Sequence, residues 1–361
     1  MARSNNNVWL HRFACALALA TLFLVALGGV VTTKGVGMAV PDWPTTYGEN
    51  MFLFSYSKWV GGVFYEHSHR LVASMVGMLT TVLAIWLWMK ESRRWLRWLG
   101  VAAFCGVVFQ GLLGGMRVVF DKYNLGTELG IFHAVFAQLF FLLVCSVALF
   151  TSRWWEGRAG DRMDSVRALA VRRWFAATIL LILVQLFFGA AMRHQHAGLA
   201  VPDFPLAYGK VWPATDAASV TRYNARRMET AGEAAITAPH IVVHMLHRLT
   251  GVAVLCAILG CAVLAWRNSS SGSLLRKISG LWVAVVLVQV ALGILTILSQ
   301  RKVDVTTAHV AVGALTFALG WMLVLIASRA VVVPVALRTV SQTDSPRSAR
   351  LSTLPVQMEN A

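Results

Sequence analysis

The sequence predicts an all-α polytopic membrane protein, with eight transmembrane helices arranged as two parallel four-helix-bundle repeats. Three observations lead to this class. Of the 361 residues, 57% are hydrophobic and only 13% are charged, a balance outside the range of soluble domains. Apolar runs of about 20 residues, the length that crosses a hydrocarbon core, recur along the whole chain. Motifs of the first half also return, in the same order, in the second half.

The apolar runs define the expected helices. They cover residues 11–32, 66–89, 98–118, 129–150, 173–193, 240–266, 277–299 and 305–328. Backbone polar groups in lipid must be satisfied internally, so each run is expected to be helical and to join a bundle.

The basic residues place the chain in the membrane rather than on nucleic acid. Lys and Arg number 32 against 16 Asp and Glu, but they are concentrated in alternate connecting segments, as the positive-inside rule describes. We therefore expect no nucleic-acid partner, contact with membrane lipid, cytoplasmic N- and C-termini, and a location in a bacterial inner (plasma) membrane.

The internal repeat is visible without gaps. AVPDWPTTYG at 39–48 returns as AVPDFPLAYG at 200–209, and the same ungapped alignment matches Gly28 with Gly189. Offsets of 178, 179 and 176 residues then match His69-Arg70 with His247-Arg248, Gln110 with Gln289, and His133 with His309, respectively. Parallel repeats of this kind are known in membrane proteins.

The repeat divides the chain into units. We expect an N-terminal four-helix repeat at 1–152, a charged cytoplasmic linker at 153–170 and a C-terminal four-helix repeat at 171–330. The tail at 331–361, rich in Ser, Thr, Pro and Arg, is expected to be disordered in the cytoplasm.

Four histidines share one depth in the expected bundle. From each of them to the first basic residue on the inner side is about 20 residues, or about 30 Å of helix. They are His69, His133, His247 and His309, two in each repeat. Ionisable groups inside a membrane are costly and usually functional, although any one of them alone could be a hydrogen-bonded packing residue.

Paired imidazoles on facing helices favour haem. A porphyrin fills the equatorial positions of iron, and one or two histidines complete its coordination in a bundle core. A zinc site would need three or four ligands converging on one point. We therefore expect two haem sites, one per repeat.

Other polar residues surround these expected sites. Arg70 and Arg248 each follow a histidine and could pair with haem propionates or reach the lipid headgroups. The two AVPD segments could lie over the sites as lids or anchor the chain at the interface. Helix packing is expected for Gln110, Gln185 and Gln289, and a surface position for His194, His196 and His240.

One position separates the repeats. Glu66 lies three residues before His69, one helical turn away on the same face. The equivalent residue before His247 is His244. A carboxyl group at a haem edge could exchange a proton or stabilise positive charge, whereas a solvated acid near a helix N-terminus would need no such role.

These motifs together resemble the haem A synthase family. The resemblance rests on the duplicated plan, the GVGMAVPDWP segment, Glu-x-x-His-Arg at 66–70 and the later histidines, and it covers about residues 10–330. It implies an oxidoreductase that oxidises a peripheral methyl group of haem O, by successive hydroxylations, to the formyl group of haem A for terminal oxidases.

The resemblance also implies residue roles. His247 and His309 would ligate the iron of a haem b that carries electrons. His69 and His133 would hold the haem O substrate and the haem A product, with Glu66 as the catalytic acid and base. Some family members carry a cysteine pair in the outer loops, but all five cysteines here fall in expected helices, which puts any mechanism needing that pair in doubt.

Expected partners are haem O synthase and the machinery of cytochrome oxidase assembly, with homo-oligomers left open. Two alternatives remain. A di-haem b-type cytochrome would pass electrons from a quinol and make no product. A parallel-repeat transporter would use the histidines as a proton relay, against which the scarcity of acids in the helices counts.

Overall fold

Eight long helices dominate the computed structural model, which describes residues 7–157, 162–163, 165–231, 235–270, 272–329 and 331–332. Within this part of the chain, eight helices are long and apolar enough to cross a membrane, which confirms the predicted all-α class with eight transmembrane helices. They are α1 (Val8–Thr33), α2 (Gly61–Lys90), α3 (Arg94–Val119), α4 (Gly126–Phe150), α6 (Ser165–His194), α8 (Ala238–Asn268), α9 (Leu274–Leu298) and α10 (Val303–Ala327).

Shorter elements connect the long helices. They are η1 (Tyr56–Lys58), η2 (Asp121–Tyr123), α5 (Arg153–Gly157), α7 (Ala217–Ala231), and the strands β1 (Arg162–Met163) and β2 (Val331–Val332), which pair in parallel. The linker expected at 153–170 therefore contains α5, β1 and the start of α6. Of the expected disordered tail, the first two residues form β2, and 333–361 lie outside the described residues.

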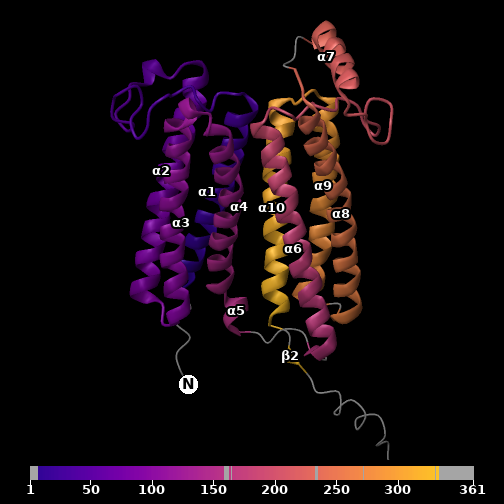
Figure 1. The fold of residues 1–361 in the computed structure, drawn as a ribbon. Coiled ribbons are helices and arrows are strands. Elements are labelled where there is room, and N and C mark those ends of the chain that lie inside the picture. The colour runs from indigo at the N-terminus through magenta and orange to yellow at the C-terminus, as the bar shows by residue number, and fades with distance from the viewer. Residues whose placement is uncertain are drawn as a thin grey trace, which may run out of the picture.

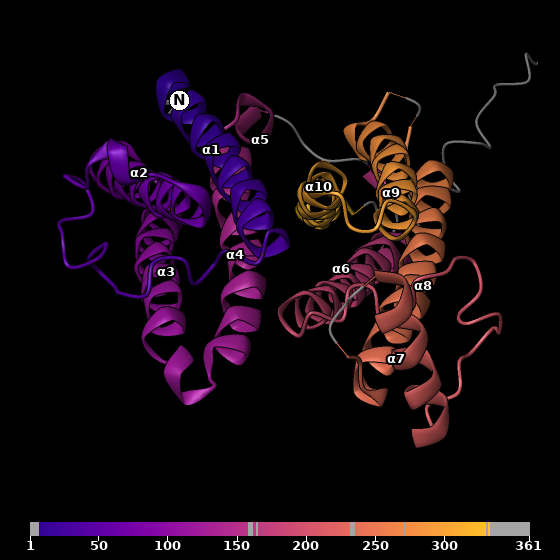
Figure 2. The ribbon, with the colours of Figure 1, turned by 90° about the horizontal axis from the view of Figure 1, so that it is seen from above.

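The long helices form two groups (Figures 1 and 2). We call α1 to α4 the N-terminal half, and α6, α8, α9 and α10 the C-terminal half. The halves meet where α1 and α4 pack against α10 and α6. We call the end at which α1 finishes and α2 starts the loop end. Figure 1 shows α7 at this end, above the C-terminal half.

The interface between the halves is part of the hydrophobic core. Phe141 and Leu142 of α4 belong to the same buried cluster as Phe175, Trp282 and Phe317 of the C-terminal half. Across the same interface, the indole N–H of Trp321 donates to the Ser146 hydroxyl at 2.8 Å. The two halves are therefore held together by apolar packing and by a specific hydrogen bond.

The C-terminal core is organised around Trp282. Its ring is fully buried, and its indole N–H donates to the carbonyl of Thr316 at 2.7 Å. Gly320 of α10 leaves space for this ring, because a Cβ there would press on Trp282 and would lie 2.6 Å from Cδ1 of Ile179.

Replacing Gly320 with Ala should destabilise the protein by about 1–3 kcal/mol, because the added methyl group overpacks the core. A lower midpoint temperature of thermal unfolding in detergent would show this. Gly260→Ala is the matched control, since no heavy atom lies within 4 Å of a Cβ at that exposed helical position. Equal midpoints for the two variants would contradict the packing described for Trp282.

Candidate functional site

A single large cavity of about 1300 Å³ is lined by residues of both halves. Its volume exceeds the ~300–1,000 Å³ of typical pockets for one small ligand. The residues predicted as ligands and as the catalytic acid all line it: Glu66, His69, His133, His247 and His309. The structure thus brings together side chains from α2, α4, α8 and α10.

The four histidines lie at matched positions along their helices. His69 is the ninth residue of α2, His133 the eighth of α4, His247 the tenth of α8 and His309 the seventh of α10. All four are therefore two to three turns from the loop end, as the depth count predicted.

A helical glycine faces each histidine from a neighbouring helix. A Cβ added to the glycine would lie 3.0 or 3.1 Å from Cε1 of the imidazole in every case. The pairs are Gly28 with His69, Gly114 with His133, Gly189 with His247, and Gly293 with His309. Glycine inside a helix costs roughly 0.5–1 kcal/mol relative to alanine, and here it leaves the room that each ring occupies.

The histidines keep ring nitrogens free for a ligand. Nδ1 of His69, His133 and His247 is buried without a hydrogen-bond partner in the described structure. Nδ1 of His309 lies 3.2 Å from the carbonyl oxygen of Gln289. Buried polar nitrogens without partners are unusual.

Three glutamines stand beside three of the histidines. Nε2 of Gln110, Gln185 and Gln289 lies 3.4 Å from Nε2 of His133, His247 and His309, respectively. Only helix packing was predicted for them. His69 has no such neighbour at the position equivalent to Gln185, because the alignment of the two AVPD segments places Leu24 there.

Both predicted lid segments are attached to α2 and α8 by equivalent arginines. Arg70 donates to the carbonyls of Val40, Asp42 and Thr45, and Arg248 to those of Val201, Asp203 and Leu206, with all six distances between 2.6 and 3.2 Å. The accepting residues correspond one to one in the alignment of the AVPD segments. The guanidinium groups are already engaged, and their contact with propionates stays a prediction.

Each lid segment is held in its conformation by hydrogen bonds from its own backbone to its aspartate. Asp42 accepts from the backbone N–H of Tyr47 and Gly48, and Asp203 accepts from the equivalent two groups. Burial opposes ionisation of Asp42, but these bonds and one from Thr45 lower its pKa below the usual value. The aromatic residue and proline that follow each aspartate line the cavity, where a lid would lie.

Glu66 is buried, not solvated. Its side chain is only 5% exposed and forms an ion pair with Arg70 at 2.6 Å. Its other carboxylate oxygen accepts from the backbone N–H of Val40 at 2.9 Å. The equivalent His244 is also buried, and its Nδ1 lies 3.3 Å from the carbonyl of Ala197. Glu66 and His244 therefore occupy equivalent positions, so the N-terminal half has a buried acid where the C-terminal half has a buried imidazole.

The surface position predicted for His194 is wrong. α6 continues to this residue, and its ring lies against α4, where a Cβ on Gly130 would be 2.7 Å from Nδ1. His194 lines the cavity together with Arg117, Arg193 and Arg301, which the sequence did not single out. His196 is exposed, as predicted.

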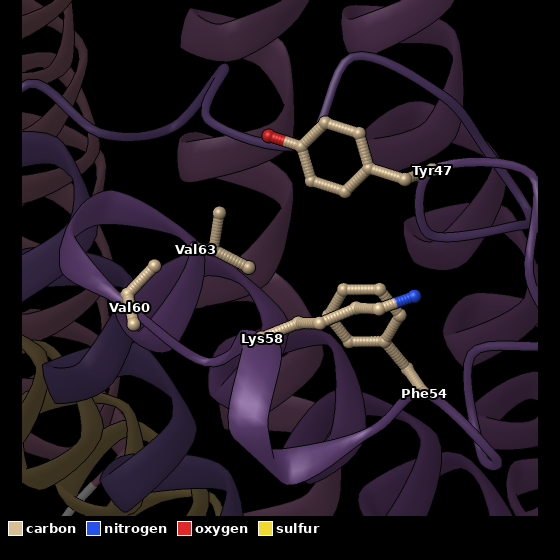
Figure 3. A pocket seen from close by; sticks show the side chains of 5 residues that line it. All are labelled: Tyr47, Phe54, Lys58, Val60 and Val63. Atoms are coloured by element: carbon tan, nitrogen blue, oxygen red, sulfur yellow. The ribbon is translucent and has the colours of Figure 1, made fainter.

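A second hollow lies in the loop of the N-terminal half. Figure 3 shows its lining side chains, which are Tyr47, Phe54, Lys58, Val60 and Val63. Nζ of Lys58 lies 5.6 Å from the centre of the Phe54 ring. None of these five residues lines the large cavity, so this hollow is separate from the histidines.

Comparison with known proteins agrees with the geometry of the site. A family model described as "Cytochrome oxidase assembly protein" (COX15-CtaA) matches residues 11–320. A protein of Halalkalibacterium halodurans named "Heme A synthase" is 27% identical over 85% of this chain and 94% of its own length. One of Lysinibacillus sphaericus with the same name is 27% identical over 90% and 97%, respectively.

A third relative, the "Heme A synthase" of Bacillus cereus, is 33% identical over 55% of this chain and 62% of its own length. The family match spans all eight transmembrane helices, and with them the four histidines and Glu66. The chain therefore belongs to the COX15-CtaA family of cytochrome oxidase assembly proteins.

Proposed function

We propose that this protein oxidises a peripheral methyl group of haem O to the formyl group of haem A. One observation carries the proposal: two pairs of cavity-lining histidines lie at matched depths in the two halves, but within the described residues only one pair has a buried carboxylate beside it. The name "Heme A synthase" shared by the relatives supports the same reaction.

The proposed roles divide between the halves. In the C-terminal half, His247 and His309 would hold haem b, which supplies electron transfer when bound. In the N-terminal half, His69 and His133 would hold haem O and then haem A. The free ring nitrogens and the glycine beside each ring suit such groups. The cavity volume suits more than one of them.

Glu66 would act as the acid and base at the substrate. Its Oε1 faces Arg70 and its Oε2 faces the Val40 N–H, so the carboxylate is held in one position at the cavity wall. From this position the carboxylate would take a proton from the substrate and return it. His244 cannot provide a carboxylate in the other half, which would relay electrons only.

The setting follows from the same proposal. The protein would lie in a bacterial inner membrane with cytoplasmic termini, receive haem O from haem O synthase and deliver haem A to the oxidase assembly machinery. Residues 1–152 would form the substrate unit and 171–330 the haem b unit.

The identity of the bound haems tests the function. We expect protein purified from cells that contain haem O synthase to yield haem B together with haem O or haem A. Protein from cells without that synthase should yield haem B alone. Haem B alone from both preparations would favour a di-haem cytochrome, and protein without any haem would favour the transporter.

Replacing Glu66 with Gln should leave haem B bound but lower the rate of haem A formation by roughly 10²–10⁴, the usual contribution of a general acid or base. Gln keeps the shape of the side chain and removes its charge. Haem extraction and chromatography would measure both quantities. Glu49→Gln is the control, because Glu49 is an exposed carboxylate paired with Lys58 in the same loop. An undiminished rate in Glu66→Gln would exclude Glu66 as the acid and base.

Replacing the glycine beside one histidine of each half with valine should affect the two proposed haem sites independently. Gly293→Val should displace His309 and lower bound haem B, since a Cβ there already lies 3.0 Å from the ring. Gly114→Val should displace His133, retain haem B and suppress haem A. The pyridine haemochrome spectrum quantifies each haem. An equal loss of haem B in both variants would contradict the assignment of haem b to the C-terminal half.

A further inference from the structure

Two arginines enter the cavity one helical turn beyond the histidine-facing glycines. Arg117 follows Gly114 by three residues in α3, and Arg193 follows Gly189 by four in α6, so each shares a helix face with its glycine. One turn is about 5.4 Å of rise toward the loop end. Both side chains line the cavity.

The two arginines are not repeat equivalents. The alignment that matches Gln110 with Gln289 pairs Arg117 with Thr296. The alignment of the AVPD segments pairs Arg193 with Thr32. Both threonines also line the cavity. Each half therefore carries one arginine and one threonine at this level, on opposite members of its helix pair.

Neither arginine has an ion-pair partner in the described part of the chain. Nε of Arg117 is buried without a hydrogen bond. Glu66 and Asp121 are within its electrostatic reach, but Glu66 is already paired with Arg70. Arg193 donates across the interface to the Gly29 carbonyl at 2.9 Å and to the Thr33 hydroxyl at 3.3 Å. These partners are neutral, and a buried charge without a counter-ion is costly.

Both arginines line the cavity together with His194 and Arg301. A Cβ on Gly130 of α4 would lie 3.1 Å from Nε of Arg117 and 2.7 Å from Nδ1 of His194, so these two side chains lie against the same residue. We call Arg117, Arg193, His194 and Arg301 the central cationic cluster.

We propose that the central cationic cluster binds carboxylates, namely the propionates of the two haems, with Arg117 serving the N-terminal half and Arg193 the C-terminal half. This inference rests on the proposed function. Arginine binds carboxylates with two parallel hydrogen bonds, and a haem carries its two propionates on one edge. Both terminal nitrogens of Arg70 and of Arg248 donate to lid carbonyls. Nε of Arg117 is buried without a hydrogen bond, as is Nε of Arg248.

Haem B and its dimethyl ester, in which the propionates are neutral, provide the test. Full-length protein stripped of haem is titrated with each in detergent, and the ratio of the two affinities is compared between variants. We expect wild type to prefer the acid. The preference should fall about tenfold or more in Arg193→Gln, the loss expected for a charged hydrogen bond, and less in Arg193→Lys. Haem O and its dimethyl ester test Arg117→Gln in the same way.

The control is Arg12→Gln, an exposed arginine of α1 whose guanidinium lies 5.1 Å from the Trp9 ring, and it should keep the wild-type ratio. Equal losses of acid and ester in the Gln variants, or unchanged ratios, would overturn the carboxylate site while leaving the proposed function intact. Failure of wild type to bind either form of either haem would instead overturn the proposed function.

Discussion

The space beside each of the four cavity-lining histidines is the constraint on which the rest of the site depends. A ring on one transmembrane helix can lie against the next helix only where that helix has no side chain, and four glycines meet this requirement. Because close packing leaves few voids in a bundle, the glycines fix which face of each helix turns toward the histidines. The cavity, the lid segments and the buried acid are then arranged around these four contacts.

The two halves share this arrangement of helices, histidines and glycines, but differ in other side chains around the histidines. The arginine that follows each first histidine holds its lid segment through three equivalent carbonyls in both halves. Glu66 corresponds to His244 in the repeat, and Leu24 corresponds to Gln185. The N-terminal half thus gains a carboxylate and lacks one amide. A reacting haem needs proton exchange, whereas a haem that passes electrons needs only stable ligation.

The long helices and the histidines could be predicted from the sequence because both depend on simple lengths. An apolar run of about 20 residues must be helical in lipid, and the count from histidine to basic residue measures depth. Helix α7 was missed because it is a polar helix that covers the C-terminal half at the loop end. α6 began earlier than predicted because it continues through a basic segment that a hydropathy argument excludes.

The arginines of the central cationic cluster escaped prediction for another reason. Candidate residues stand out in the sequence when they repeat in both halves, whereas Arg117 and Arg193 are paired with threonines. His194 lies just beyond the apolar run, so only the packing of α6 on Gly130 shows that it is enclosed. In contrast, Gly114 and Gly293 match each other in the same alignment as Gln110 and Gln289, and that alignment could have revealed them.

The central claim is that the two histidine pairs hold haems with different fates. Protein loaded with haem B that contains ⁵⁷Fe, and then supplied with unlabelled haem O under turnover conditions, tests it directly by mass spectrometry of the haems. We expect the haem A formed over many turnovers to carry unlabelled iron, while labelled haem B stays in the protein. Loss of labelled haem B in proportion to turnover would contradict the claim.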